Sequence, residues 1–219
     1  MSQTEPYVIS ISRQIGCGGS YIGKRLASRL GILYVDREII TRAAQKLNVT
    51  EKEIIARNEK VTPLWRSMVE ATLYGNPFGY VPPPLNVPSD KELYQAEAEI
   101  IQDIARQASV VIIGRAGYHT LRNHSRHLSV FLHADVAFRE QRVQEIYHLS
   151  AAEARKQVQS TDSSRASYLH AKTGGDWVDA RQYHLALDTG VLGLELVEEI
   201  IVTAVQARFL SDGSGAGAP

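Results

Sequence analysis

Glycines and an arginine gather directly after the first apolar segment of the chain. Residues 7–12 alternate in polarity and are rich in β-branched side chains, which predicts a strand. A glycine cluster follows, and a helical pattern begins directly after it. Glycines let backbone N–H groups converge on an anion, and a helix N-terminus adds partial positive charge. We therefore predict phosphate binding here, with a tight turn that binds nothing as the alternative. The predicted phosphate-binding loop consists of Gly16, Cys17, Gly18, Gly19 and Ser20.

The lysine expected in such a loop is missing. The pattern G-x-x-x-x-G-K-[ST] has a literal near-match that ends at Lys24, but apolar residues recur in helical phase from Ile22 onward. Lys24 would then lie on the flank of a helix that has already begun. Counting back from the helix aligns Gly19 with the lysine and Arg13 with the first glycine. We predict that Arg13 supplies the missing charge over the donor phosphates; a surface ion pair is the alternative.

Two further residues of the loop have side chains that could take part in chemistry. Ser20 stands where the Mg²⁺-binding hydroxyl of such loops belongs, although a helix N-cap role explains it equally well. Cys17 lies among N–H groups that are predicted to converge, which would lower the pKa of its thiol and make it sensitive to oxidation or alkylation. A small residue that fills a crowded turn is the simpler interpretation of Cys17.

Charged residues also follow three other predicted strands. Asp36, Arg115 and Asp188 each come at the end of a short apolar segment, where parallel sheets present their ligand groups. The forked guanidinium of Arg115 suits a phosphate or a base edge, so we predict acceptor binding for it, with a structural role as the alternative. Asp188 could instead cap a helix with Thr189.

The elements that would position these residues alternate along the chain. Strands are predicted at 7–12, 32–35, 109–114, 128–132 and 184–187, and helices at 20–30, 37–47, 89–104, 135–148, 150–159 and 197–205. Residues 160–182 are polar and rich in turn formers. Because most strands are apolar throughout, we expect a parallel sheet covered on both faces, a three-layer α/β fold.

Composition limits the classes of function. The 219 residues carry 24 basic and 24 acidic side chains, so overall charge gives no reason to expect binding to nucleic acid or to an anionic membrane. A single cysteine excludes an internal disulfide framework. No apolar run approaches the roughly 20 residues that span a bilayer, and we expect a soluble, cytoplasmic protein. The tail 211–219 is too poor in apolar groups to fold and is predicted to be disordered.

Taken together, these motifs resemble the cytidylate kinase-like family of nucleoside monophosphate kinases. The resemblance rests on SRQIGCGGSYIGKRLASRLG, YVDREIITRAA, VVIIGRAGYHTL, VFLHADVAFREQRV, TDSSRASYL and ALDTGVLGLELVEEII, and covers most of residues 7–205. It implies a single P-loop kinase-type domain over 1–210, with a five-stranded parallel sheet. The implied core comprises 7–36, 108–148 and 183–208, with an acceptor-binding insertion at about 37–107 and a lid at about 149–182.

The resemblance also implies roles for individual residues. Arg42 would bind the phosphate of the acceptor, Asp36 would lie nearby, and Asp188 would face the acceptor's sugar or order the base pocket. Arg139 and Arg165 would stabilise transition-state charge. Arg142 and Asp162 would belong to the same lid. Without the family, the arginines would be solvated helix charges.

The resulting prediction is ATP- and Mg²⁺-dependent phosphoryl transfer to a nucleoside monophosphate, CMP or a close relative. Its partners would then be small-molecule nucleotides. Two alternatives remain open at this point. The loss of the lysine favours a nucleotide-binding module without turnover, acting as a sensor or partner-binding domain. The unusual Arg37 segment permits a kinase of another small molecule.

Overall fold

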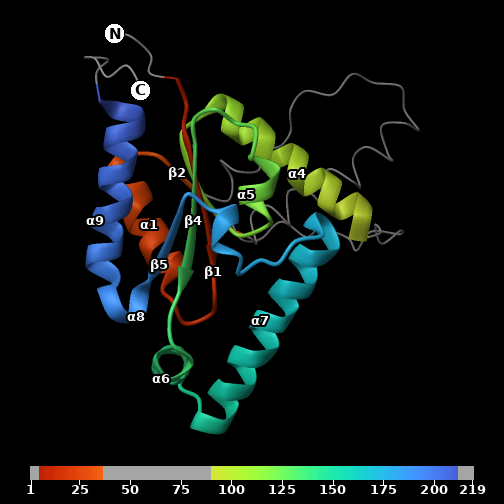
Figure 1. Ribbon diagram of the computed structural model, residues 1–219, viewed down its shortest axis with the longest axis vertical. Coiled ribbons are helices and arrows are strands. Elements are labelled where there is room, and N and C mark those ends of the chain that lie inside the picture. Colours follow the sequence, from red (N-terminus) through yellow and green to blue (C-terminus); the bar gives the residue numbers. More distant parts are fainter. Residues whose placement is uncertain (1–4, 37–89, 212–219) are drawn as a thin grey trace, which may run out of the picture.

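The computed structural model describes residues 5–36 and 90–211 of the chain. Within these residues, five parallel strands form one sheet in the order β2-β3-β1-β4-β5 (Figure 1). Each strand lies within one residue of its predicted bounds, so the predicted parallel sheet is confirmed. The strands are β1 (Val8–Arg13), β2 (Leu33–Val35), β3 (Val110–Ile113), β4 (His127–His133) and β5 (Leu185–Asp188).

Strand β1 is central, between β3 and β4, and its side chains are buried on both faces. Ile9 pairs with Val111 on one side and with Leu128 on the other. Such continuous apolar strands are typical of a parallel sheet that is covered on both faces. The carboxyl ends of β1 and β3 therefore meet at one edge, where the predicted loop and Arg115 follow them.

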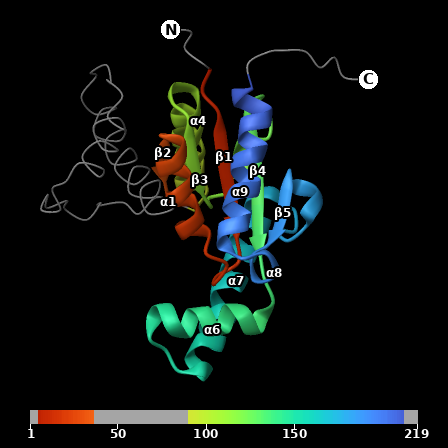
Figure 2. The ribbon, with the colours of Figure 1, turned by 90° about the vertical axis from the view of Figure 1, so that its left-hand side faces the viewer.

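Helices α1 (Gly19–Leu30) and α9 (Leu194–Val205) cover one face of the sheet (Figure 2). Ile22 and Leu26 of α1 pack with Val197 and Ile201 of α9 in the same apolar cluster as β1 and β4. The two helices are also joined by charge, because the buried carboxylate of Glu198 pairs with arginines of α1. The helical phase predicted from Ile22 onward is confirmed.

The opposite face is covered by α4 (Asp90–Gln107) and α5 (Gly117–Thr120). Ile100, Ile101 and Ile104 of α4 are buried against Val110 and Ile112 of β3. Helices on both faces give the three-layer α/β fold that was predicted.

Two further helices lie beyond the carboxyl edge of the sheet: α6 (Val136–Tyr147) and α7 (Ala151–Thr173), which meet at an angle below the strands (Figure 1). Ser150 and Glu153 form a capping box at the start of α7, where the sequence predicts that a helix begins. The prediction that 160–182 is irregular is wrong over its first half, because α7 continues to Thr173. The remaining elements are η1 (Ala180–Gln182), α8 (Thr189–Leu192) and η2 (Gln206–Leu210).

Several predictions concern segments outside the described residues. These are the helix at 37–47 with Arg42, most of the acceptor-binding insertion at about 37–107, and the tail from 212 onward. Among the helices that the structure does describe, none combines the length and apolar character required to cross a bilayer.

Two histidines beside the sheet, His127 that is buried and His184 that is exposed, have lowered pKa values and predict how stability depends on pH. Nε2 of His127 lies 2.7 Å from Oγ of Ser10, and Nδ1 of His184 accepts from the backbone N–H of Ser129 at 2.9 Å. Burial, and then the neighbouring His184 and His124, lower the pKa of His127 from 6.5 to about 4, and burial lowers the pKa of His184 as well. Protonation therefore favours the unfolded chain.

Stability should accordingly be complete above pH 6.5 and fall as the pH drops toward 4. Between pH 6.5 and 5, His127 alone is expected to remove about 2 kcal/mol of unfolding free energy. Urea unfolding at pH 7.5, 6 and 5 measures this slope, and His127→Asn should flatten it. Equal unfolding free energies of the wild type at pH 7.5 and 5 would contradict the prediction.

Candidate functional site

The loop between β1 and α1 is shaped by glycines that admit no side chain. Gly16 and Gly18 have φ angles of 86° and 74°, a left-handed conformation that favours glycine. A Cβ on Gly16 would lie 2.8 Å from the backbone oxygen of Arg139, and one on Gly18 would lie 2.7 Å from Leu194. Gly18 occupies the N-cap position of α1, so the N-cap alternative for Ser20 is wrong. Ser20 lies in the first turn of α1 with its side chain exposed.

Gly19 makes room for Arg13. A Cβ on Gly19 would lie 2.7 Å from Cγ and 3.1 Å from Cβ of Arg13, and a Cβ on Gly114 would meet Nη1 of the same side chain. Arg13 therefore runs from the end of β1 across Gly19 toward Gly114. The position that aligns with the missing lysine is thus covered by the side chain of Arg13.

A cavity of about 410 Å³ opens at this edge of the sheet. It lies beyond the ends of β1 and β3, between them and α7. Three arginines from three different elements line it: Arg13 from β1, Arg115 from the turn after β3, and Arg165 from α7. The other lining residues are Ser12, Gly114, Ala116, Ser160, Thr161, Ser164, Tyr168, Leu169 and Trp177. This cationic edge is where anionic ligands of a parallel sheet are expected.

The turn that carries Arg115 is strained. Gly114, Arg115 and Ala116 have φ angles of 80°, 52° and 52°, and for side chains other than glycine this region costs of order 1 kcal/mol per residue. Nε of Arg115 forms an ion pair with Oε1 of Glu97 at 3.3 Å. Its guanidinium carbon lies 5.1 Å from the ring centre of Tyr168. Arg115 is thus held at the cavity by α4 and α7 together.

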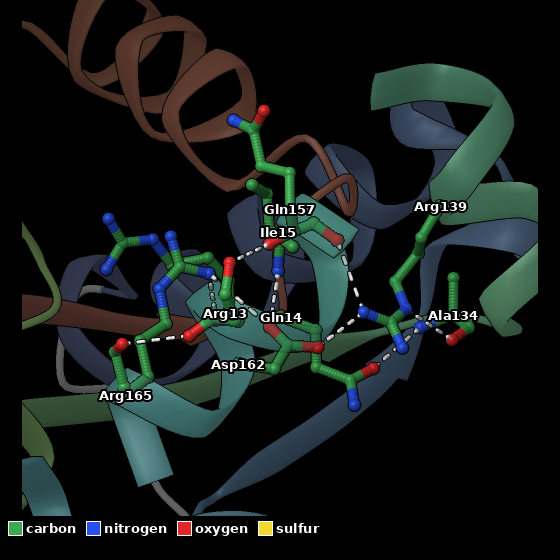
Figure 3. A network of polar contacts seen from close by, with 10 residues as sticks. Arg13, Gln14, Ile15, Ala134, Arg139, Gln157, Asp162 and Arg165 are labelled. Carbon is green, nitrogen blue, oxygen red and sulfur yellow. Dashed lines mark hydrogen bonds and ion pairs between the residues drawn. The ribbon is translucent and has the colours of Figure 1, made fainter. Parts of the chain in front are cut away.

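Asp162 of α7 anchors the glycine loop from below (Figure 3). Its Oδ1 accepts from the backbone N–H of Ile15 at 3.0 Å, and its Oδ2 pairs with Nη1 of Arg139 at 2.5 Å. Arg139 also donates through Nε to the carbonyl of Ala134 at 3.0 Å and is only 4 % exposed. Arg139 therefore lies beneath the loop and outside the residues that line the cavity.

The other two predicted lid arginines also contact the loop backbone. Arg165 donates from Nη1 to the carbonyl of Arg13 at 2.9 Å while lining the cavity, as Figure 3 shows. Arg142 donates from Nε to the carbonyl of Gly16 at 3.0 Å. The helices α6 and α7 thus hold the backbone at 13–16 through three carbonyl groups and through the N–H group of Ile15.

The remaining predicted residues lie around this edge. Asp188 ends β5 and caps α8, accepting from the N–H groups of Gly190 and Val191 at 2.9 and 3.1 Å, which confirms the helix-cap alternative. Asp36 is half-buried directly after β2. Burial raises the pKa of Tyr34, and both Ser20 and Asp36 lie near enough to affect it. Both residues carry side-chain oxygen atoms, the type of ligand that Mg²⁺ prefers.

Cys17 is fully buried, and the expectation of a reactive thiol is wrong. Burial raises its pKa from 9.0 to about 11, and a hydrogen bond with Thr189 only partly opposes this effect. At pH 8 the native thiol should react roughly 100-fold more slowly with a disulfide reagent than the thiol of the urea-unfolded chain, because its thiolate fraction is that much smaller. The rate of reaction with dithiobis(nitrobenzoate) is measured for the native and for the urea-unfolded chain. Equal rates would contradict the prediction.

Sequence reasoning missed two residues of the site, Glu97 and Tyr168. Glu97 is in helical phase with Ile101 and Ile104, so an acid within the apolar stripe of α4 was the available signal. Tyr168 follows Arg165 by three residues, which places both on one side of α7 once that helix is known to continue.

Comparisons with known proteins agree with this architecture. The sequence model of the cytidylate kinase-like family matches residues 8–191, whereas no curated protein matches the chain. An uncharacterized protein from Eubacterium ventriosum has a similar structure, with a TM-score of 0.69, 19 % identity, and coverage of 92 % of this chain and 99 % of that one. A shikimate kinase from Acinetobacter baumannii, solved in complex with shikimate, has a TM-score of 0.49, 13 % identity, and coverage of 95 % and 97 %. The protein therefore belongs to the cytidylate kinase-like family, and its five-stranded parallel sheet covered on both faces is a P-loop kinase-type fold.

Proposed function

We propose that this protein transfers the γ-phosphoryl group of ATP to a nucleoside monophosphate, CMP or a close relative, with Mg²⁺ as its cofactor. The observation that carries the proposal is the convergence of Arg13, Arg115 and Arg165 on one cavity beside the glycine loop. Guanidinium groups are permanently charged and match phosphate oxygens in pairs, so three of them favour two phosphorylated substrates that meet there.

The donor side is the glycine loop with Arg13. Its backbone N–H groups and the N-terminus of α1 would receive the donor phosphates, as in other loops of this kind. Arg13 would take the role of the absent lysine, since its side chain lies across Gly19 and reaches Gly114. Ser20 and Asp36 would hold Mg²⁺, which neutralises charge on the donor phosphates when bound.

The acceptor side is Arg115, with Arg42 as a second phosphate ligand by family resemblance. Arg115 is mostly buried and projects from a strained turn, which is typical of groups held in place for a ligand. Asp36 would lie beside the acceptor, and Asp188 would order the pocket through α8, which it caps.

In the transfer, an oxygen of the acceptor phosphate forms a bond to the γ-phosphorus as the bond to the bridging oxygen of ADP breaks. The acceptor phosphate is already anionic at neutral pH, so no general base has to remove a proton. Arg165 would stabilise the charge on the transferred group from α7. Arg139 and Arg142 would act indirectly, by holding the loop through Ile15 and Gly16.

A nucleotide-binding module without turnover is the second candidate. One observation favours it. Arg165 and Arg142 donate to the backbone carbonyl groups of Arg13 and Gly16, so both guanidinium groups already have hydrogen-bond acceptors within the protein. Turnover requires Arg165 to exchange its bond with the Arg13 carbonyl for the phosphates, or to serve both.

One assay separates these functions. The full chain is incubated with ATP, Mg²⁺ and a panel of nucleoside monophosphates, nucleosides and unrelated alcohols, and ADP is followed. We expect ADP with a monophosphate, CMP first. ATP binding without ADP would identify a binding module, and ADP only with a non-nucleotide alcohol would identify a kinase of another small molecule.

A further inference from the structure

A buried carboxylate and a tyrosine hold the acceptor-side arginine from two helices. Both oxygens of Glu97 are engaged: Oε1 pairs with Nε of Arg115 at 3.3 Å, and Oε2 accepts from the hydroxyl of Tyr168 at 2.9 Å. The ring of Tyr168 in turn faces the guanidinium of Arg115. The three side chains therefore form a closed set, the Glu97–Tyr168–Arg115 triad, with each member in contact with the other two.

The triad restricts the orientation of the Arg115 guanidinium. Its buried carboxylate would be an unfavourable way to stabilise the fold if that were its only role. Glu97 is 1 % exposed, and burying a carboxylate is unfavourable unless its partners compensate. Arg115 itself sits on the strained turn after β3. Its long side chain would otherwise sample many rotamers, and contact with a carboxylate on one edge and an aromatic ring on one face restricts it.

We propose that Glu97 and Tyr168 are positioning residues, which hold the guanidinium of Arg115 in the orientation that binds the phosphate of the acceptor. The inference rests on the proposed function of Arg115. Binding of the acceptor phosphate depends on the orientation of the guanidinium. A guanidinium misplaced by about 1 Å can no longer donate two parallel hydrogen bonds to the phosphate oxygens. Tyr168 shares its side of α7 with Arg165, so one helix sets the position of cations on both the donor and the acceptor side.

The direction of one mutational effect distinguishes positioning from simple electrostatics. Glu97→Gln removes a negative charge from the surroundings of the cavity. If Glu97 acted through its charge alone, this change would strengthen the binding of an anionic acceptor. If Glu97 positions Arg115, the same change weakens acceptor binding. If it serves stability alone, acceptor binding stays unchanged while the free energy of unfolding falls.

The test compares Glu97→Gln and Tyr168→Phe with the wild type, with ATP and the acceptor varied separately. We expect the KM for the acceptor to rise about tenfold in Glu97→Gln, while the KM for ATP stays within twofold. Tyr168→Phe keeps the ring over Arg115 and loses only the hydroxyl, so a rise of about threefold is expected. Glu99→Gln, on the exposed side of α4, and Tyr147→Phe, at an exposed position of α6, are the matched controls and should leave both KM values unchanged.

A lower or unchanged acceptor KM in Glu97→Gln would overturn the proposal, as would equal rises in the KM values of both substrates. Calorimetric titration of the full chain with inorganic phosphate makes the same comparison without turnover. Weaker phosphate binding in both variants supports the triad even if no acceptor is found, and unchanged binding overturns it. Absence of turnover in the wild type, by contrast, counts against the proposed function alone.

Discussion

Replacing Arg13 with alanine is expected to lower turnover at least ~100-fold, the loss typical when a group that stabilises transition-state charge is removed. The physical reason is the position of its side chain, which covers the glycine that stands in place of the loop lysine. The KM for ATP should rise as well, because the same guanidinium would bind the donor phosphates before the reaction. ADP formation at varied ATP concentration measures both effects.

The matched control is Arg106→Ala, which removes an arginine that is 67 % exposed on α4 and should leave the rate unchanged. A second variant tests directly whether Arg13 takes the role of the missing loop lysine. Gly19→Lys alone should not raise activity, because its Cβ would lie 2.7 Å from Cγ of Arg13. Arg13→Ala removes this Cγ and leaves a Cβ at 3.1 Å, so in the double variant a small shift accommodates the lysine and part of the lost rate should return. A wild-type rate in Arg13→Ala would refute the role of Arg13.

The second large effect is expected at Asp162. Its carboxylate joins the backbone of Ile15 to the buried Arg139, so Asp162→Ala leaves a guanidinium that is 5 % exposed without its ion pair. Breaking a buried pair in this way typically costs about 3 kcal/mol of unfolding free energy. The loop also loses an anchor, and we expect weaker ATP binding in the folded variant. Urea unfolding and calorimetric titration with ATP measure the two effects.

Asp162→Asn provides the graded comparison, because an amide oxygen can still accept from Ile15 but the charge is gone. Its stability and ATP affinity should lie between those of the wild type and the alanine variant. Asp103→Ala, at a more exposed ion pair on α4, controls for the loss of a surface carboxylate. If Asp162→Ala unfolds at the same urea concentration as the wild type, the loop is held by its other contacts.

Most of the strands were predictable because they are short apolar or β-branched runs that end at turn residues, and β1, β3 and β4 are buried over nearly their whole length. Helix α7 was predicted to end near 159 since residues 160–164 read Ser-Thr-Asp-Ser-Ser, which are weak helix formers. In the structure these residues are kept helical by long-range contacts. Asp162 accepts from Ile15, and Arg165 donates to the carbonyl of Arg13.

The chemistry of individual side chains was harder to predict than their location. Proximity of Cys17 to N–H groups suggested a lowered pKa, but its enclosure by apolar side chains reverses the direction. Arg139 matched the lid arginines of the family by position, yet its side chain points beneath the loop to Asp162. Such outcomes depend on contacts between residues distant in the sequence, 23 positions for Arg139 and Asp162 and 124 for Arg139 and Ile15, for which the local pattern contains no signal.

The left-handed turn at 114–116 means that heat resistance and activity make opposite demands on this chain. Glycine at Ala116 would relieve a φ angle of 52° at little cost to packing volume, whereas glycine at Arg115 would leave the buried carboxylate of Glu97 without its ion pair. A selection for thermal tolerance alone would therefore favour glycine at position 116. The Ala116→Gly variant should survive heating better, while its more mobile turn holds Arg115 less firmly for the substrate.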